Sequence, residues 1–510
     1  MAESTRLVAA TTAPADGDNA SKTTNGGGSS LDTILNIVNI AFGAGMLGLP
    51  YAIQGAGFVS GIVGMGIVLF WNFYCCSLLV QLRNEVLSGR ANASKGSALS
   101  ADLGSPVSFT AIGRYAMGSV GLALVYVSVV VTLLGAATAY FINSNELLRE
   151  THIYLNPGWS ANTAMYANTV IYMCLMYPLT CIKSLAPLSK LSFPAIVALI
   201  AGFVVIIKLG LDMHGVPPVE EVLSWDSLYI PVTFNGFSTF FGVAAFSYGA
   251  TIIIPEIQES MANTDDFIGA LKISLWAIWG SYSVLGGVAL LIYQQAGPVS
   301  DNIMAQLPAA SVVQEPLLLL ITMATLFTYP LAMQPVASIF TQALIQAGFG
   351  ESSENAASGQ YGALSTGSSP SGSFSAAVAP GATSFGGQGP SAAAVQEEGG
   401  AQNAENSPPS PPSPDQLPPV LYYGLRAALV LFTGVCATSV PNFGVVVSLL
   451  GSFSVTLGSF VLPPLFHRAV FAGRLTPMED AVDLVLCCIG VVTCVFTTTT
   501  TAIGVLNGED

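Results

Sequence analysis

Apolar runs of about 20 residues, the length of helix that crosses the hydrocarbon core of a bilayer, recur along almost the whole chain. Only 8% of the 510 residues are charged, whereas a soluble domain carries about 25%. This pattern predicts an all-α polytopic membrane protein. We expect eleven transmembrane helices, at residues 34–54, 57–82, 118–145, 163–182, 191–211, 234–257, 267–294, 315–347, 421–439, 444–466 and 481–504.

The basic residues indicate how these helices are oriented. If the N-terminus is cytosolic, only Arg149 and Lys208 fall on the far side of the membrane, and the other 12 of the 14 basic residues fall on the cytosolic side. Cytosolic loops carry an excess of Lys and Arg. The split predicts a cytosolic N-terminus and, with eleven spans, a C-terminus outside the cell or in a lumen. We expect an integral multi-pass protein of the plasma membrane or of a vacuolar or lysosomal membrane.

Two segments have a composition that cannot fill a packed core. Residues 1–30 are rich in Thr, Gly and Ser, and residues 348–419 are rich in Gly, Ser, Ala and Pro. Such segments bury too little apolar surface to offset the entropy lost on ordering. We expect a disordered cytosolic tail, a disordered cytosolic loop, and helices 1–8 and 9–11 over residues 31–347 and 420–510. The loop is either a tolerated spacer or a regulatory segment. The second alternative rests on three serines that each precede a proline: Ser407, Ser410 and Ser413.

The first and sixth apolar runs are interrupted at their centres. The first contains Gly43, Gly45 and Pro50, and the sixth contains Gly249 and Pro255. Inside a helix each glycine costs about 1 kcal/mol and each proline about 3 kcal/mol relative to alanine. These two runs open the first and the second set of five helices. Interrupted helices at matching positions of two halves indicate an inverted-repeat transporter with its binding site near the midplane of the membrane.

Each break is expected to offer main-chain groups to a ligand. Pro50 lacks an N–H and would free the carbonyl of Met46, and Pro255 would free the carbonyl of Thr251. The second half of a broken helix also begins with free N–H groups, which attract a carboxylate. Donors for a carboxylate and acceptors for an ammonium group in one site suit an amino acid. Plain packing of small residues between helices is the alternative, and it explains two matching breaks less well.

Three stretches of the chain resemble the amino acid/auxin permease family. They are the "GAGMLGLPYA" sequence at 43–52, residues 246–249 with 256–258, and the stretch 440–467 that ends in "LPPLFH". The resemblance implies an amino acid carrier with the LeuT-type fold, that is, a 5+5 inverted repeat plus one extra helix, with helices 1 and 6 broken. Many relatives carry a histidine where this chain has Ala250, so no role for that histidine carries over.

The motifs of the two broken helices supply the candidate site. Tyr140 in the third helix and Tyr248 in the sixth are candidate gates, although an aromatic belt at the membrane interface is an alternative position for Tyr140. The candidate substrate-binding residues are Gly43, Ala44, Gly45, Met46, Leu47, Phe246, Ser247, Tyr248, Gly249 and Tyr140.

The coupling ion is open between a proton and sodium. Glu256 follows the proline of the sixth run, and a partly desolvated carboxyl there could bind and release a proton. The alternative is a carboxylate at the cytosolic end that caps a neighbouring helix or holds a basic residue. Thr325 and Thr328 of the eighth helix could complete a sodium site against the first helix, or bond back to their own helix. The "PEIQ" sequence favours protons.

The remaining ionisable residues form no recognisable catalytic or metal-binding set. Asp480 and Asp483 begin the eleventh helix, where we expect them at the membrane interface. The three histidines do not cluster, and the eight cysteines all fall within predicted spans. We therefore expect no enzymatic activity, no metal site and no cofactor. The expected partners are an amino acid substrate, a co-transported proton or sodium ion and the lipid bilayer, but no nucleic acid.

The sequence as a whole predicts a secondary active transporter that moves small amino acids across a membrane by alternating access, coupled to protons or to sodium. The competing interpretation is an amino acid sensor of the same fold. Such a sensor would bind its ligand and signal through its cytosolic tails with little flux.

Overall fold

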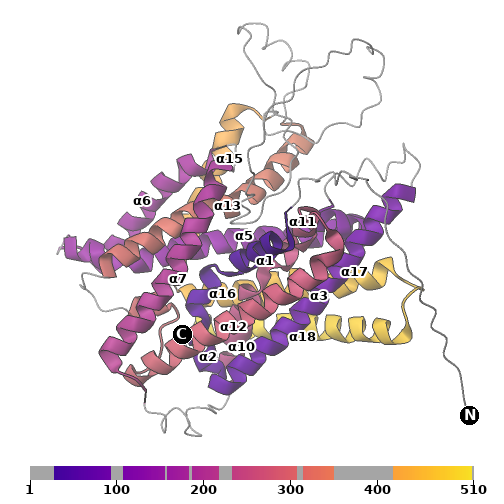
Figure 1. Ribbon diagram of the computed structural model, residues 1–510. Helices are drawn as coiled ribbons and strands as arrows, with labels where there is room; N and C mark the ends of the chain where they lie inside the picture. The colour runs from indigo at the N-terminus through magenta and orange to yellow at the C-terminus, as the bar shows by residue number, and fades with distance from the viewer. Residues whose placement is uncertain are drawn as a thin grey trace, which may run out of the picture.

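The computed structural model describes residues 28–92, 107–155, 158–182, 186–217, 233–306, 314–349, 417–440 and 442–507. The described residues are helical apart from turns and one isolated bridge between Gly28 and Met261 (Figure 1). The predicted all-α class is therefore confirmed. The predicted tail over 1–30 and the predicted loop over 348–419 lie almost wholly outside the described residues.

Helices occupy each of the eleven predicted ranges, as α1 (Ser30–Ala41), η1 (Ala44–Gly48), α2 (Leu49–Ala56), α3 (Phe58–Asn92), α5 (Phe109–Leu155), α6 (Ala161–Thr180), α7 (Ala186–His214), α10 (Phe234–Ser247), η2 (Gly249–Ile253), α11 (Ile254–Glu259), α12 (Phe267–Tyr293), α13 (Gln314–Leu344), α15 (Pro419–Ser439), α16 (Phe443–Leu450), η10 (Gly451–Val455), η11 (Leu457–Val461), α17 (Leu462–Val470) and α18 (Pro477–Asn507). Within the described residues, seven helical stretches are long and apolar enough to cross a membrane. A total of eleven crossings stays a prediction.

The third helix is longer than predicted and bent. α5 begins at Phe109 rather than at residue 118, and its backbone leaves the helical conformation at Met117 and Gly118. Gly118 has φ +61°, a conformation that favours glycine. The prediction missed the first turns because Arg114 interrupts the apolar pattern there, so the apolar run starts only at the bend.

The first and sixth helices are interrupted in the same way. α1 ends at Ala41, η1 makes a 3-10 turn, and α2 then begins with Pro50 in its first turn. α10 ends at Ser247, η2 makes a second 3-10 turn, and α11 begins with Pro255 in its first turn. Proline is favoured at the start of a helix because the N–H that it lacks would have no partner there. Each proline therefore begins the second half of its broken helix.

The two carbonyls that we expected the prolines to free are bonded. The N–H of Leu49 donates to the carbonyl of Met46, and the N–H of Ile254 donates to the carbonyl of Thr251. These bonds form because the N–H groups of a 3-10 helix reach carbonyls three residues back rather than four. The prediction that Met46 and Thr251 offer free carbonyls to a ligand is wrong.

The two broken helices lie side by side and run in opposite directions. At one end of the bundle, the N–H of Gly28 donates to the carbonyl of Ser260 at 2.9 Å, and the N–H of Ala262 donates to the carbonyl of Gly28 at 3.0 Å. At the other end, a Cβ on Gly55 would lie only 3.3 Å from the Cα of Gly236. We call these the Gly28 end and the Gly55 end. The antiparallel pair is what an inverted repeat requires.

The other helices enclose this pair. α12 packs along both halves of the first broken helix, and α16 and α18 pack against α10, the first half of the sixth. α5 crosses the bundle and contacts α13, α16 and α17. Figure 1 shows α6, α13 and α15 together, on the side of the bundle away from α3, α17 and α18. The two breaks therefore lie inside the bundle, where α5 and α12 meet them.

Candidate functional site

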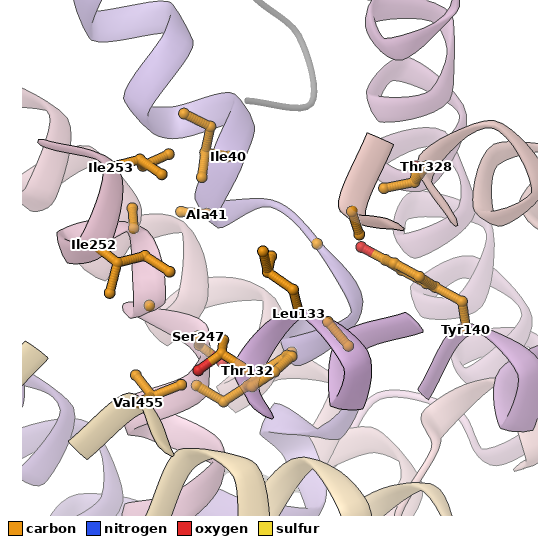
Figure 2. A pocket seen from close by; sticks show the side chains of 17 residues that line it. Ile40, Ala41, Thr132, Leu133, Tyr140, Ser247, Ile252, Ile253, Thr328 and Val455 are labelled. Atoms are coloured by element: carbon orange, nitrogen blue, oxygen red, sulfur yellow. The ribbon is translucent and has the colours of Figure 1, made fainter. Parts of the chain in front are cut away.

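A cavity of about 120 Å³ lies between the two breaks. Figure 2 shows Ile252 and Ile253 on one side of it, and Tyr140 and Thr328 on the opposite side. Its 17 lining residues come from both broken helices, α5, α13 and η10, and they are Ile40, Ala41, Gly43, Gly45, Thr132, Leu133, Ala136, Tyr140, Phe246, Ser247, Gly249, Ala250, Ile252, Ile253, Thr328, Ala332 and Val455. None of these side chains carries a charge. A charged group of a ligand would therefore have to meet main-chain groups and hydroxyls.

Many of the residues proposed from the sequence meet at this cavity, although they lie on four different helices, the two broken helices, α5 and α13. They are Gly43, Gly45, Tyr140, Phe246, Ser247, Gly249 and Thr328. At Gly43 the backbone is extended, with φ −119° and ψ −158°, so the chain leaves the helical path there. Ala44 and Thr325 lie in η1 and α13, but their side chains are outside the part of the structure that is described.

Three proposed binding residues lie outside the cavity. Met46 and Leu47 are buried in the apolar core, where η1 packs against its neighbours. Tyr248 is also buried, and its ring packs against Tyr282 of α12, with the ring centroids 5.8 Å apart. The side chain of Tyr248 therefore points toward α12 rather than toward the cavity. Its place next to the break could be read from the sequence, but its direction could not.

Glu256, in α11, also lies outside the cavity, and its side chain contacts the first residue of α5. Its Oε1 accepts a hydrogen bond from the N–H of Phe109 at 3.3 Å, and its Oε2 has no hydrogen-bond partner among the described residues. The neighbouring Glu259 accepts a bond from the N–H of Val107 at 3.1 Å and lies 3.7 Å from Nη2 of Arg83. Both carboxylates therefore face the partial positive charge at the N-terminus of α5. Capping of a neighbouring helix is the role that the sequence left open for Glu256 as an alternative to proton binding.

Asp483, near the start of α18, is fully buried inside the bundle. Its Oδ1 accepts a hydrogen bond from the hydroxyl of Tyr74 at 2.6 Å, and its Oδ2 lies 2.6 Å from Nδ1 of His467. The sequence did not indicate this burial, because the position of a residue near a helix end does not show which face of that helix packs inward. Asp480, in contrast, is half-exposed and pairs with Arg468 at 2.7 Å.

The segment 298–306, after α12, joins three helices at the Gly55 end. It contains η5 (Ile303–Gln306). The N–H of Val299 donates to Oε1 of Gln54 in α2 at 2.9 Å, and Oδ2 of Asp301 accepts from the N–H of Gly444 in α16 at 2.8 Å. Nδ2 of Asn302 donates to two residues of α5, to Oδ1 of Asn143 at 2.9 Å and to Oε2 of Glu146 at 2.7 Å. With the main-chain bonds at the Gly28 end, each end of the bundle therefore has a hydrogen-bonded joint, and the cavity lies between these two joints.

Tyr282 of α12 contacts both breaks, although nothing in the sequence singled it out. Its hydroxyl lies within hydrogen-bond distance of the carbonyls of Ala41 and Ser247, the last residues of α1 and α10. The sequence around it carries no signal, because α12 is an uninterrupted apolar helix. Only the packing of α12 along the first broken helix shows where this hydroxyl lies.

A polytopic helical protein with two antiparallel broken helices and a cavity between their breaks belongs to the class of inverted-repeat membrane transporters. The comparisons identify the family within this class. The family model described as transmembrane amino acid transporter protein matches residues 26–503, and the chain belongs to this family. The predicted resemblance to the amino acid/auxin permeases, and the fold class that it implied, are confirmed.

The similar proteins include two plant transporters and one solved structure. The chain is 26% identical to the amino acid transporter ANT1 of Arabidopsis thaliana over 490 residues, which cover 95% of each protein. It is 25% identical to the amino acid transporter AVT3A of the same plant over 491 residues, or 94% of this chain and 90% of the relative. The solved structure of MhsT in complex with L-phenylalanine is 13% identical with a TM-score of 0.49, covering 93% of this chain and 98% of that one.

Proposed function

We propose that this chain is a secondary active transporter that carries small amino acids through the cavity between the two breaks. The observation that carries the proposal is the make-up of the cavity, which is lined by the backbone of both breaks and by no charged side chain. The carboxylate of an amino acid would be met by main-chain N–H groups at the start of η1 and η2, and its ammonium group by carbonyl groups at the ends of α1 and α10. Tyr140 and Thr328 add hydroxyls on the wall opposite Ile252 and Ile253.

The size of the cavity favours a small substrate. The volume of the cavity is about 120 Å³. Most of the side chains that line the cavity are apolar, with Leu133, Ile252 and Val455 among them. An amino acid with a short side chain fits these conditions, and a large aromatic one would require the walls to move apart.

In alternating access, the cavity would open to one side of the membrane at the Gly28 end and to the other side at the Gly55 end. We propose that the Gly28 end faces the cytosol and the Gly55 end faces the opposite side, as the distribution of basic residues predicts. The cavity opens to the cytosol when the main-chain bonds between Gly28 and the Ser260–Ala262 segment separate. It opens to the other side when the 298–306 segment releases α2, α5 and α16. Each opening breaks a small number of hydrogen bonds, which suits a protein that interconverts between two states.

We also propose that amino acid transport is coupled to a proton or to sodium. For a proton, Glu256 supplies a carboxyl with one oxygen unpartnered within the described residues. For sodium, Thr328 lines the cavity close to the first break, and Thr325 lies one turn earlier in α13. We favour the proton, and we propose that the protein is resident in the plasma membrane or in a vacuolar or lysosomal membrane.

Ligand-induced stabilisation tests the site. We expect alanine to raise the melting temperature of the purified protein, because a ligand at 100 times its Kd adds about 2.7 kcal/mol to the free energy of unfolding. N-acetylalanine lacks the ammonium group and alaninamide lacks the carboxylate, so neither should stabilise. Stabilisation by all three compounds at equal concentration would show that the cavity does not recognise both charged groups.

A further inference from the structure

The hydroxyl of Tyr282 lies between the carbonyl ends of two half-helices. The side chain is 0% exposed, and its oxygen lies 3.1 Å from the carbonyl oxygen of Ser247 and within hydrogen-bond distance of that of Ala41. Ala41 closes α1 and Ser247 closes α10, and both residues line the cavity (Figure 2). One side chain of an unbroken helix therefore contacts both chain breaks directly beside the cavity.

The carbonyl groups at the ends of the two half-helices attract a hydrogen-bond donor such as the hydroxyl of Tyr282. The last carbonyls of a helix have no partner within that helix and carry the negative end of its dipole. Two such ends meet here, because α1 and α10 run in opposite directions and both end at the centre of the bundle. A hydroxyl carries one proton, so Tyr282 donates to one of these carbonyls at a time. Its oxygen lies between the ends of the two half-helices and can donate to either, and the carbonyl of Ala41 also accepts a bond from the N–H of Gly43 at 2.7 Å.

The aromatic ring of Tyr282, like its hydroxyl, contacts both breaks. The ring packs against Phe42, with centroids 5.9 Å apart, and against Tyr248, with centroids 5.8 Å apart. Phe42 directly follows Ala41, and Tyr248 directly follows Ser247. In each break, one residue therefore presents its carbonyl to the hydroxyl, and the next residue presents its ring to the ring. The two breaks contact Tyr282 in corresponding ways.

We propose that Tyr282 is a positioning residue that holds the two breaks at the separation at which their main-chain groups bind the amino acid. This inference rests on the proposed function of the cavity. Without the hydroxyl, the ends of α1 and α10 lose their common partner and move independently of each other. The main-chain groups of the cavity then meet the charged ends of the substrate less well, while the apolar packing around the ring is unchanged.

Tyr282→Phe tests the proposal, with Tyr293→Phe as the matched control. Both tyrosines belong to α12 and are buried, and the hydroxyl of Tyr293 donates to the carbonyl of Ile206 at 2.8 Å, in α7. Both variants therefore lose one buried bond from a tyrosine to a carbonyl, but only Y282F loses it at the breaks. We expect Y282F to raise the KM for alanine uptake about tenfold, which corresponds to about 1.4 kcal/mol, with a smaller change in Vmax. Y293F should leave the KM unchanged.

A purely structural role predicts a different result. Loss of stability lowers the amount of folded transporter and so lowers Vmax alone, to a similar extent in both variants. An unchanged KM in Y282F, or the same rise in KM in Y293F, would overturn the proposal.

Hydrogen exchange provides a readout that does not depend on transport. In the purified protein, we expect Y282F to speed amide exchange in both residues 41–48 and 247–253, and Y293F to speed it in neither. Faster exchange at only one break, or at none, contradicts a link between the two. If the unmodified protein took up no amino acid while this exchange pattern appeared, the proposed function would fail and the positioning role of Tyr282 would stand.

Discussion

We expect replacement of Gly45 with valine to abolish amino acid uptake, while the protein still reaches the membrane. A Cβ at this position would lie 2.6 Å from Oγ of Ser247, 3.1 Å from Cδ1 of Phe246 and 3.2 Å from Cα of Ser247. The hydroxyl can turn away, but the Cα atom cannot move without displacing α10. Overpacking of this kind costs about 1–3 kcal/mol, and the methyl groups of valine also enter the space between the breaks. The measurement is the initial rate of labelled alanine uptake into proteoliposomes that contain equal amounts of protein.

Gly269→Val is the control for this variant. Gly269 lies in the first turn of α12 and is exposed, and a Cβ there would meet nothing within 4 Å. The same change of residue type should therefore leave uptake close to that of the unmodified protein. Uptake by G45V at more than about half the unmodified rate would contradict the close packing of η1 against α10 on which the site depends.

Glu256→Gln is expected to abolish accumulation driven by a proton gradient, while exchange of amino acid across the membrane continues. An ionisable group at membrane depth is costly and marks proton pathways, and glutamine cannot take up and release a proton. Its amide oxygen can still accept the bond from the N–H of Phe109, so the cap of α5 is retained. Concentrative uptake and counterflow are measured on the same proteoliposomes, with labelled alanine as the substrate.

Glu259→Gln separates coupling from capping. Glu259 binds the same helix start, through the N–H of Val107, but its side chain is 37% exposed and lies beside Arg83. We expect this variant to retain gradient-driven accumulation. If E256Q also accumulated alanine against its gradient, Glu256 would be a cap of α5 only, and the proton would have to bind elsewhere.

The interruption of the two helices was predictable, because glycine and proline act through the local backbone. Each of these residues costs free energy in a helix interior, so glycine and proline in one run, as Gly43, Gly45 and Pro50 or Gly249 and Pro255, indicate a break, whereas proline alone does not, since α13 continues through Pro330 and Pro335. The matching positions of the breaks in two halves then predict the antiparallel pair that the contacts at Gly28 and Gly55 show.

The direction of individual side chains was not predictable in the same way. Tyr248 points toward α12, and Asp483 is buried against Tyr74, because the packing of distant helices decides which face turns inward. The 3-10 turns also differ from the expectation, since they bond the carbonyls of Met46 and Thr251 that an ideal α-helix would leave free. Tyr282 could not be found from the sequence at all, since its role depends on two carbonyls from different helices.

The most direct test of the central claim is uptake of labelled alanine into proteoliposomes under an inward proton gradient, an inward sodium gradient or no gradient. We expect accumulation above the external concentration with one of the two gradients, the proton gradient being favoured, and only equilibration without a gradient. If alanine raised the melting temperature of the protein but entered the proteoliposomes under none of the three conditions, the cavity would bind its ligand without transporting it, and the claim of active transport would be contradicted.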